Sequence, residues 1–242
     1  MRAASPPCMR DWLALHGMTA QGCARLLATE PPLPEPVAHS DTAAEWPDGP
    51  ALWALVARAL THRLPELTPE IEQTAGATVL NFAPDRARHP KPFALYITEK
   101  SLVYVSCPLS RSAADLAIAA HEFGHALQLH CIAGAALAPV LRETCAFLAE
   151  EMVPPGLADL SVGHAGAAAD ALAGHRARNL GAMRQRLQAC LARPGAAYDY
   201  SWNYPPARIL ALLLLQEGTG AVRRAVFHGE KSLADLRRDL HA

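Results

Sequence analysis

Residues 115–130, DLAIAAHEFGHALQLH, carry two histidines four positions apart, with a glutamate beside the first. In an α-helix, residues i and i+4 project from nearly the same face, so His121 and His125 can offer two imidazole nitrogens to one ion. Zinc accepts such ligands in a tetrahedral arrangement, and Glu122 can reach a water that the ion makes acidic. The H-E-x-x-H spacing therefore predicts a zinc peptidase site, with Glu122 as general base.

A helix that only buries histidines would show the same spacing by chance. Here the flanking residues are apolar, and Ser112 with Asp115 three positions later fits a capping box that starts the helix near residue 113. An uncompensated His-Glu-His cluster on such a buried helix would be costly. We therefore favour one zinc ion per chain over a structural histidine cluster.

The third metal ligand has more than one candidate. The pattern H-E-x-x-H-x-x-G-x-x-H would need His at 131, where this chain has Cys131, so that pattern holds only if the cysteine binds the ion. A glutamate from the next helix is the other possibility, and LRETCAFLAEEMVPP supplies Glu143 after a turn and an antiparallel return. We predict Glu143 as the ligand, with Cys131, Asp159 and His164 as the next candidates.

Two further carboxylates lie on the same predicted helix. Glu150 follows Glu143 by two helical turns and shares its face, so it can accept a hydrogen bond from the free N–H of a ligand histidine. Glu151 points to another side, and we expect it to be solvated.

The rest of the chain predicts a mainly α (α+β) protein. FALYI (93–97) and LVYVSC (102–107) are β-branched and aromatic runs that predict one β-hairpin. Gly124 inside the histidine helix indicates close packing against a neighbouring element. Pro154, Pro155 and Gly156 are expected to end the helix that carries Glu143. Helices are expected at 8–29 with a break near 16–18, and at 51–64, 113–130, 137–152, 166–192 and 207–217.

We expect two regions. Residues 1–66 form an accessory helical region with a proline-rich linker at 31–50, and residues 67–242 form the catalytic domain. The 242 residues include 22 basic and 23 acidic side chains, a balance that gives no reason to expect nucleic acid or an anionic membrane as a partner. The apolar run at 209–215 is too short to span a bilayer, and we do not expect MRAASPPCMRDW to act as a secretory signal, because no apolar run follows its first arginine. The six cysteines form no C-x-x-C pair, so we expect reduced thiols in a soluble cytoplasmic protein.

HEFGHALQ (121–128) and ETCAFLAE (143–150) resemble the metal-binding helices of glutamate-type zincins, most of all those of the thimet oligopeptidase / oligoendopeptidase F family in shortened form. YDYSWNY (198–204) and FHGEKSLADLRRDL (227–240) resemble that family's C-terminal region. The resemblance implies a zincin-like helical catalytic domain with a small β-hairpin, a zinc ion and a peptide substrate aligned on the strand FALYI.

The resemblance also implies a tyrosine hydroxyl that stabilises the oxyanion, for which Tyr200 is the best match and Tyr198 the second. The family carries a histidine shortly before this element. AMRQRLQACLARPGAA contains none, so His164 or His228 is the expected substitute.

The predicted activity is zinc-dependent endopeptidase cleavage of short or unstructured peptides. Only about 90 residues precede the hairpin, too few for the family's deep channel, so we expect a dedicated substrate such as a precursor or leader peptide. One alternative is a regulatory metallopeptidase, recruited to a protein partner through residues 1–66. ETCAFLAEEMVP is similar to the corresponding helix of peptidases that cleave phage repressors. A second alternative is that the protein is a structural module that a metal ion stabilises and that has no enzymatic activity. The sequence leaves the oligomeric state open.

Overall fold

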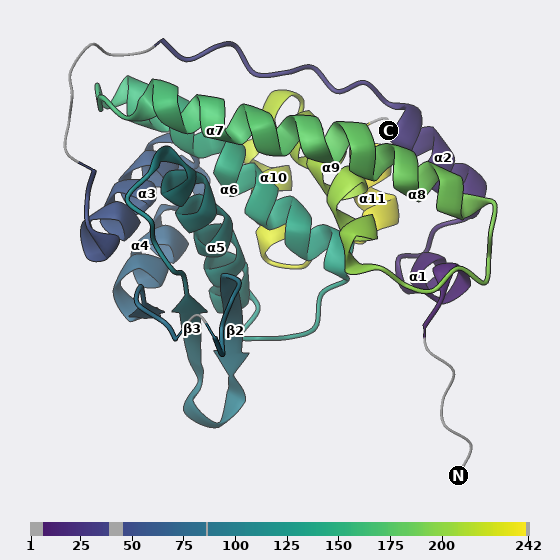
Figure 1. Ribbon diagram of the computed structural model, residues 1–242, viewed down its shortest axis with the longest axis horizontal. Coiled ribbons are helices and arrows are strands. Elements are labelled where there is room, and N and C mark those ends of the chain that lie inside the picture. The colour runs from purple at the N-terminus through teal and green to yellow at the C-terminus, as the bar shows by residue number, and fades with distance from the viewer. Residues whose placement is uncertain (1–6, 39–45, 86, 241–242) are drawn as a thin grey trace.

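The computed structural model describes residues 7–38, 46–85 and 87–240, which form a mostly helical protein with one small sheet (Figure 1). The N-terminal helices are α1 (Met9–Leu15), α2 (Ala20–Ala28), α3 (Gly49–Arg63) and α4 (Thr68–Ala77), with the 3-10 turn η1 (Pro65–Leu67) between the last two. The sheet has strands β1 (Val79–Asn81), β2 (Phe93–Ile97) and β3 (Leu102–Ser106), with the turn η2 (Thr98–Lys100). The remaining elements are α5 (Ala113–Cys131), α6 (Pro139–Asp159), α7 (Ala165–Arg178), the π-helical segment η3 (Asn179–Met183), α8 (Arg184–Leu191), the 3-10 turn η4 (Tyr200–Asn203), α9 (Tyr204–Gln216), α10 (Gly220–Phe227) and α11 (Leu233–Asp239).

Helices α5 and α6 pack against each other at the centre, and α3, α7 and α9 pack around them. The capping box of Ser112 and Asp115 is present, and α5 begins at Ala113 as predicted. Gly124 lies where the two central helices meet. A Cβ at this position would stand 2.7 Å from Ala146 Cα, which confirms the close packing expected there.

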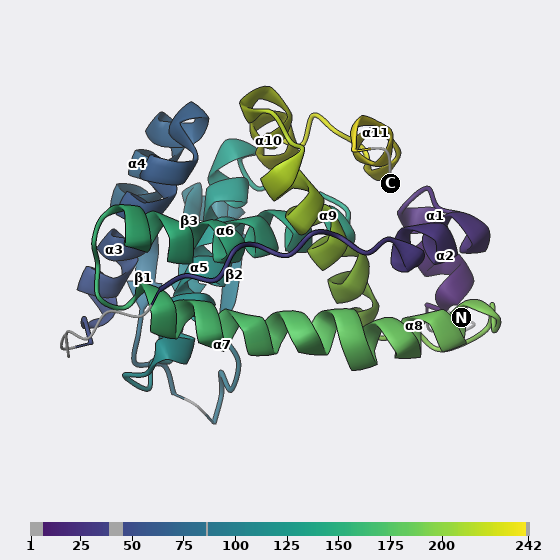
Figure 2. The same cartoon turned by 90° about the horizontal axis from the view of Figure 1, so that it is seen from above.

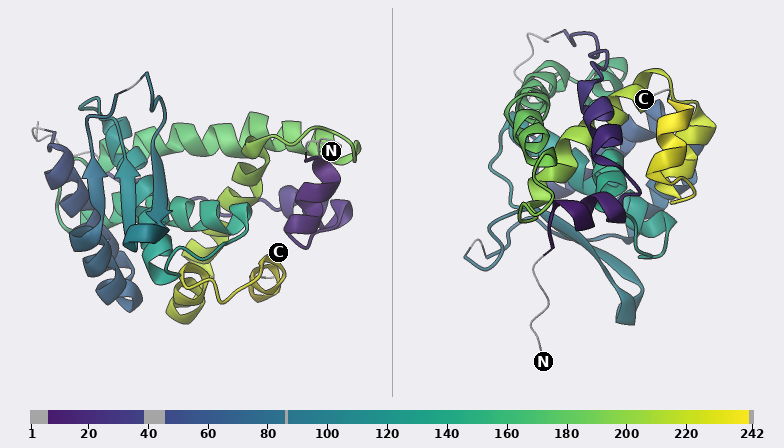
Figure 3. Two further views of the ribbon diagram at one scale, coloured as in Figure 1. Left: turned by 90° about the horizontal axis from the view of Figure 1, so that it is seen from below. Right: turned by 90° about the vertical axis from the view of Figure 1, so that its right-hand side faces the viewer.

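The predicted hairpin is confirmed. β2 and β3 pair antiparallel with Leu95 opposite Tyr104, and Figure 3 shows the hairpin projecting from the helices. The structure adds the short strand β1, which pairs parallel to β3, so the sheet order is β1-β3-β2 and β2 is an edge strand. The three residues VLN of β1 are too few for their alternation to stand out in the sequence.

The prediction that Pro154, Pro155 and Gly156 end the helix is wrong, because α6 continues through them to Asp159. The two prolines remove backbone donors, but the segment is held by packing: Leu157 is fully buried, and a Cβ on Gly156 would lie 2.6 Å from the Ala59 carbonyl oxygen of α3. Tertiary packing has overridden local propensity here.

The expected long helix at 166–192 is present as α7, η3 and α8 in one continuous run. The interruption is local, with Gly181 at the non-helical angles φ −97° and ψ −105°. The break predicted near residues 16–18 is also present, between α1 and α2.

Helix α3, although assigned to the accessory region, packs into the same core as α5. The Trp53 ring lies 4.5 Å from that of Phe123, centroid to centroid. Between α2 and α3, the described residues 29–38 have no regular structure and run beside α7 (Figure 2). The division at residues 66 and 67 stays a prediction, and residues 39–45 of the linker lie outside the described part.

Within the described residues, no helix combines the length and apolarity needed to cross a bilayer. All six cysteines are free thiols.

Replacing Gly124 by alanine should destabilise the protein by about 1–3 kcal/mol, because the new methyl group overlaps the α6 backbone. Gly174→Ala in α7 is the matched control. No atom lies within 4 Å of a Cβ built there, so we expect stabilisation by about 0.4–1 kcal/mol. Urea unfolding of the three proteins measures both effects. Equal stability of Gly124→Ala and wild type would contradict the close α5–α6 contact.

Candidate metal centre

His121, His125 and Glu143 converge where α5 meets α6, with one ligand atom from each lying within 4.8 Å of the others. His121 Nε2 is 3.5 Å from Glu143 Oε2, and His125 Nε2 is 3.7 Å from Glu143 Oε1. The two imidazole rings stand perpendicular, with centroids 4.7 Å apart. The helical spacing has thus placed both histidines on one face, opposite a carboxylate of the next helix.

These three side chains form a group that could hold a metal ion. Tetrahedral bonds of about 2.0–2.2 Å separate two ligand atoms by roughly 3.4 Å. The two histidine nitrogens lie 3.5 Å and 3.7 Å from the two different carboxylate oxygens of Glu143. Glu143 is 2% exposed, and within the described part of the chain its Oε2 atom accepts no hydrogen bond. A buried carboxylate oxygen without a partner is costly, and a cation between the three groups would remove that cost.

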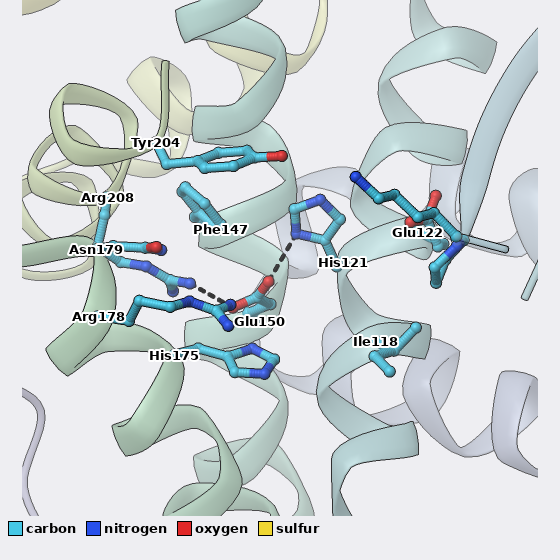
Figure 4. Close-up of a pocket in the computed structure, with 12 residues that line it drawn as sticks. Ile118, His121, Glu122, Phe147, Glu150, His175, Arg178, Asn179, Tyr204 and Arg208 are labelled. Carbon is cyan, nitrogen blue, oxygen red and sulfur yellow. Dashed lines mark hydrogen bonds and ion pairs between the residues drawn. The ribbon is translucent and has the colours of Figure 1, made fainter. Parts of the chain in front are cut away.

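His121 is held in one orientation by Glu150. Its Nδ1–H donates to Glu150 Oε1 at 2.6 Å, which leaves Nε2 facing Glu143 (Figure 4). Burial lowers the pKa of His121, but the hydrogen bond to Glu150 and its charge outweigh burial and raise that pKa to about 9. Among the described residues, His125 Nδ1 has no hydrogen-bond partner, and burial holds the pKa of His125 well below its usual range.

Glu150 is itself kept ionised by Arg208 of α9. Arg208 is fully buried and donates from NH2 to Glu150 Oε2 at 2.5 Å, and from NH1 to Glu151 Oε1 at 2.8 Å. Burial raises the pKa of Glu150, but the charge of Arg208 and the hydrogen bond from His121 lower it to about 2. Arg208 could not be singled out from the sequence, because a lone arginine within an apolar helix forms no motif with a recognisable spacing.

Glu151 is not solvated, contrary to prediction. It is 1% exposed and lies between Arg208 and Arg176, whose NH2 donates to Glu151 Oε2 at 2.6 Å. The α6 helix is surrounded on several sides, by α7 and α9 as well as α5, so few of its faces reach solvent. Helical position alone could not reveal this.

Glu122 lies beside the cluster and is 4% exposed. Its Oε2 atom has no hydrogen-bond partner among the described residues. Burial, with a smaller contribution from the charge of Glu143, raises the pKa of Glu122 to about 7 against the opposing effect of His121. A carboxyl with this pKa can both accept and release a proton near neutrality.

Tyr200 and Tyr198 differ in whether their hydroxyl groups reach the group of His121, His125 and Glu143. The Tyr200 hydroxyl donates to Glu143 Oε1 at 2.7 Å, so it reaches the cluster directly. Burial, and then the charge of Glu143, raises the pKa of Tyr200. The Tyr198 hydroxyl accepts from Asn203 Nδ2 at 3.0 Å, and the Tyr198 ring packs against Trp202.

Tyr204 and His175 are residues that sequence reasoning missed. Both line a pocket beside His121 and Glu122, and Figure 4 shows the Tyr204 hydroxyl pointing towards His121. Burial, followed by the charges of Glu143 and Glu122, raises the pKa of Tyr204 to about 12. The run YDYSWNY contained Tyr204 and was the available signal. No motif marked His175.

The other expected residues lie outside the His121–His125–Glu143 group. Asp159 pairs with Arg63 at 3.2 Å, and burial raises the pKa of the Cys131 thiol to about 12. His164 stacks on Trp46 with centroids 4.2 Å apart, and His228 Nε2 lies 3.1 Å from Glu70.

Comparison with known proteins supports the fold. No family model matches the sequence, and no curated protein is significantly similar to it. Two solved structures match. One is PZ peptidase A with an inhibitor, at 15% identity and a TM-score of 0.52, covering 81% of this chain and 46% of that one. The other is a chain assigned as oligoendopeptidase F, at 13% identity and a TM-score of 0.47. This match covers 95% of this chain and 53% of the oligoendopeptidase chain.

The chain thus spans about half the length of the structures it matches. At this identity, the likeness to PZ peptidase A shows the fold. The prediction of a mainly α fold with a small sheet is confirmed.

Replacing Arg208 by methionine should destabilise the protein by about 3–5 kcal/mol, because Glu150 and Glu151 would stay buried without their shared cation. Arg238→Met is the control, since its ion pair with Asp235 is exposed to solvent and should contribute little to stability. Guanidinium unfolding compares the two. Equal losses would mean that the buried pair contributes no more than a surface pair.

Proposed function

We propose that the protein is a zinc-dependent metalloendopeptidase that hydrolyses peptide bonds in short or unstructured peptides. The observation that carries the proposal is the convergence of His121, His125 and Glu143 at zinc-like separations, with the unpartnered Glu122 beside them. The fold shared with PZ peptidase A agrees with this activity.

In this proposal, His121, His125 and Glu143 hold one zinc ion, which would polarise the peptide carbonyl and make a water acidic. Glu122 accepts the proton of the attacking water at its free Oε2 and then delivers it to the leaving amine. Burial raises the pKa of the Glu122 carboxyl, which makes its carboxylate a better acceptor for the proton of the water. Glu150 fixes the ring and tautomer of His121 through the Nδ1–H bond.

The oxyanion donor is assigned to a tyrosine, because a phenol aimed at developing charge stabilises the transition state. Tyr200 is the first choice and reaches the cluster through Glu143. Tyr204 lines the pocket beside Glu122 and is the second choice on geometry. Tyr198, the second choice from sequence, has its hydroxyl engaged by Asn203.

The substrate is proposed to be a dedicated peptide, such as a precursor or leader segment. The regulatory alternative, in which residues 1–66 recruit a protein partner, also stays a prediction. Deleting the whole region would remove α3 from the core, so a test of recruitment should alter exposed residues of α1 and α2 instead.

Purified protein should contain about one zinc per chain, and Glu143→Gln should weaken zinc binding by at least about 100-fold, because one of three ligands is lost. Below pH 9, zinc must displace a proton from His121, so affinity should rise with pH up to about 9. Elemental analysis and competition with a chelator measure both. Glu99→Gln, on the exposed turn η2, is the control. Full zinc affinity in Glu143→Gln would show that another residue is the third ligand.

Glu122→Gln should lower kcat by about 10²–10⁴-fold on any peptide that the zinc-loaded wild type cleaves, because the general base is lost. Zinc content and unfolding midpoint should be unchanged. Measuring kcat and zinc content on the same Glu122→Gln sample therefore separates a loss of catalysis from a loss of metal binding. Retained cleavage in Glu122→Gln would rule out its proposed role, whereas zinc without any cleavage in the wild type would favour a metal-stabilised module.

A further inference from the structure

The pocket beside the proposed zinc site is lined by positive side chains that no described residue neutralises. It has a volume of about 240 Å³ and opens next to His121 and Glu122. Lys91 and Arg178 line it, and neither forms an ion pair among the described residues. Arg208 lines it too, but its charge is taken up by Glu150 and Glu151. Within the described part of the chain, the pocket thus presents two cationic side chains, Lys91 and Arg178, that have no ion-pair partner.

The carboxylates of the pocket do not cancel these charges. Glu150 already interacts with Arg208 and His121. Glu122 is the other carboxylate, and it lies on the side of the proposed metal (Figure 4). A zinc ion at the adjacent site would add further positive charge. An anionic group is therefore the favoured occupant.

The backbone changes its form where α7 reaches this pocket. The helix passes into the π-helical segment at Asn179, directly after Arg178. Such segments cost stability and occur often at functional sites. Asn179 is only 3% exposed and lines the pocket, and its side chain makes no hydrogen bond within the described part of the chain. Figure 4 shows Asn179 on the same wall as Arg178, with His175 one turn earlier.

These groups match a carboxylate. The planar guanidinium of Arg178 can donate two parallel hydrogen bonds to carboxylate oxygens, and Asn179 and His175 can add neutral donors. The volume is below the range of about 300–1,000 Å³ typical of pockets for drug-sized ligands, so it suits a single residue rather than a longer segment. On a peptide, such an anion is either an Asp or Glu side chain or the C-terminal α-carboxylate.

We propose that this pocket binds a carboxylate of the substrate through Arg178, Lys91 and Asn179, so that the enzyme prefers peptides with an acidic group near the cleaved bond. The proposal rests on the peptidase function above and names the substrate class of that same site. Arg178 is exposed and lies at the end of α7, so replacing it should leave the fold intact.

The test is the cleavage of a proteome-derived peptide library by the zinc-loaded protein, read by mass spectrometry. Wild type, Arg178→Gln and Arg186→Gln are compared. Arg186 is exposed on α8 and does not line the pocket, so it is the matched control. The library is run with free and with amidated C-termini. Synthetic Glu/Gln peptide pairs then give kcat and KM.

Wild type and Arg186→Gln should cut acidic peptides with the same preference. Arg178→Gln should lose roughly 10- to 100-fold in kcat/KM on acidic peptides, mainly through KM, and little on their neutral counterparts. Enrichment of Asp or Glu at a fixed distance from the cut identifies a side chain as the bound group. Cuts at a fixed distance from the C-terminus, lost on amidation, identify the α-carboxylate.

Cleavage without a preference for acidic peptides would overturn this inference and leave the proposed peptidase function unaffected. An acidic preference that is unchanged in Arg178→Gln would have the same consequence. Absence of any cleavage by zinc-loaded wild type would overturn the peptidase function, and this inference with it.

Discussion

The close approach of α5 to α6 at Gly124 is the constraint on which the candidate site depends. Gly124 lies between His121 and His125, and it faces Ala146, which lies between Glu143 and Glu150. Any side chain at the crossing would push the helices apart. Ligand atoms from two helices can share one ion only when they meet within a few tenths of an ångström, because metal–ligand bonds are short and nearly fixed in length. The absence of a side chain at Gly124 therefore determines how closely the helices that carry His121, His125 and Glu143 approach each other.

The crossing buries charge, and the structure compensates it with further charge. Glu150 orients His121 but would be costly in an apolar core by itself, so Arg208 pairs with it. Arg208 also contacts Glu151, which in turn pairs with Arg176 of α7. His121, a proposed metal ligand, is thereby connected through buried hydrogen bonds and ion pairs to α9 and α7. Their packing supports the site even though neither helix carries a proposed ligand.

The parts of the site that sequence could predict are those set by local spacing. His121, Glu122 and His125 follow from a helical repeat, and Glu143 and Glu150 from a second one. Arg208 and His175 come from segments whose relation to the motif is set only by tertiary packing, so no spacing marked them. Tyr204 was marked only as part of the run YDYSWNY. Glu151 was misjudged for the same reason.

The fold shows the same division between local and non-local information. Capping residues, the hairpin runs and the break between α1 and α2 are local signals, and each element is present. The prolines at 154 and 155 are local signals too, yet packing of α6 against α3 outweighs them. The π-helical turn at Asn179–Met183 has no distinct composition, because NLGAM could equally continue an α-helix.

The proposed catalytic side and the proposed binding side share one face of α6. Glu143, Phe147 and Glu150 follow each other at helical spacing, with Phe147 between the two carboxylates. The Arg208 guanidinium lies 3.8 Å from the centre of the Phe147 ring, and the Tyr204 ring meets the same ring edge-on at 5.9 Å. One aromatic side chain therefore contacts both the arginine that pairs with Glu150 and the tyrosine that lines the pocket. Because close-packed side chains cannot move independently, this ring links the position of Tyr204 in the pocket to that of Arg208 beside the proposed metal ligands.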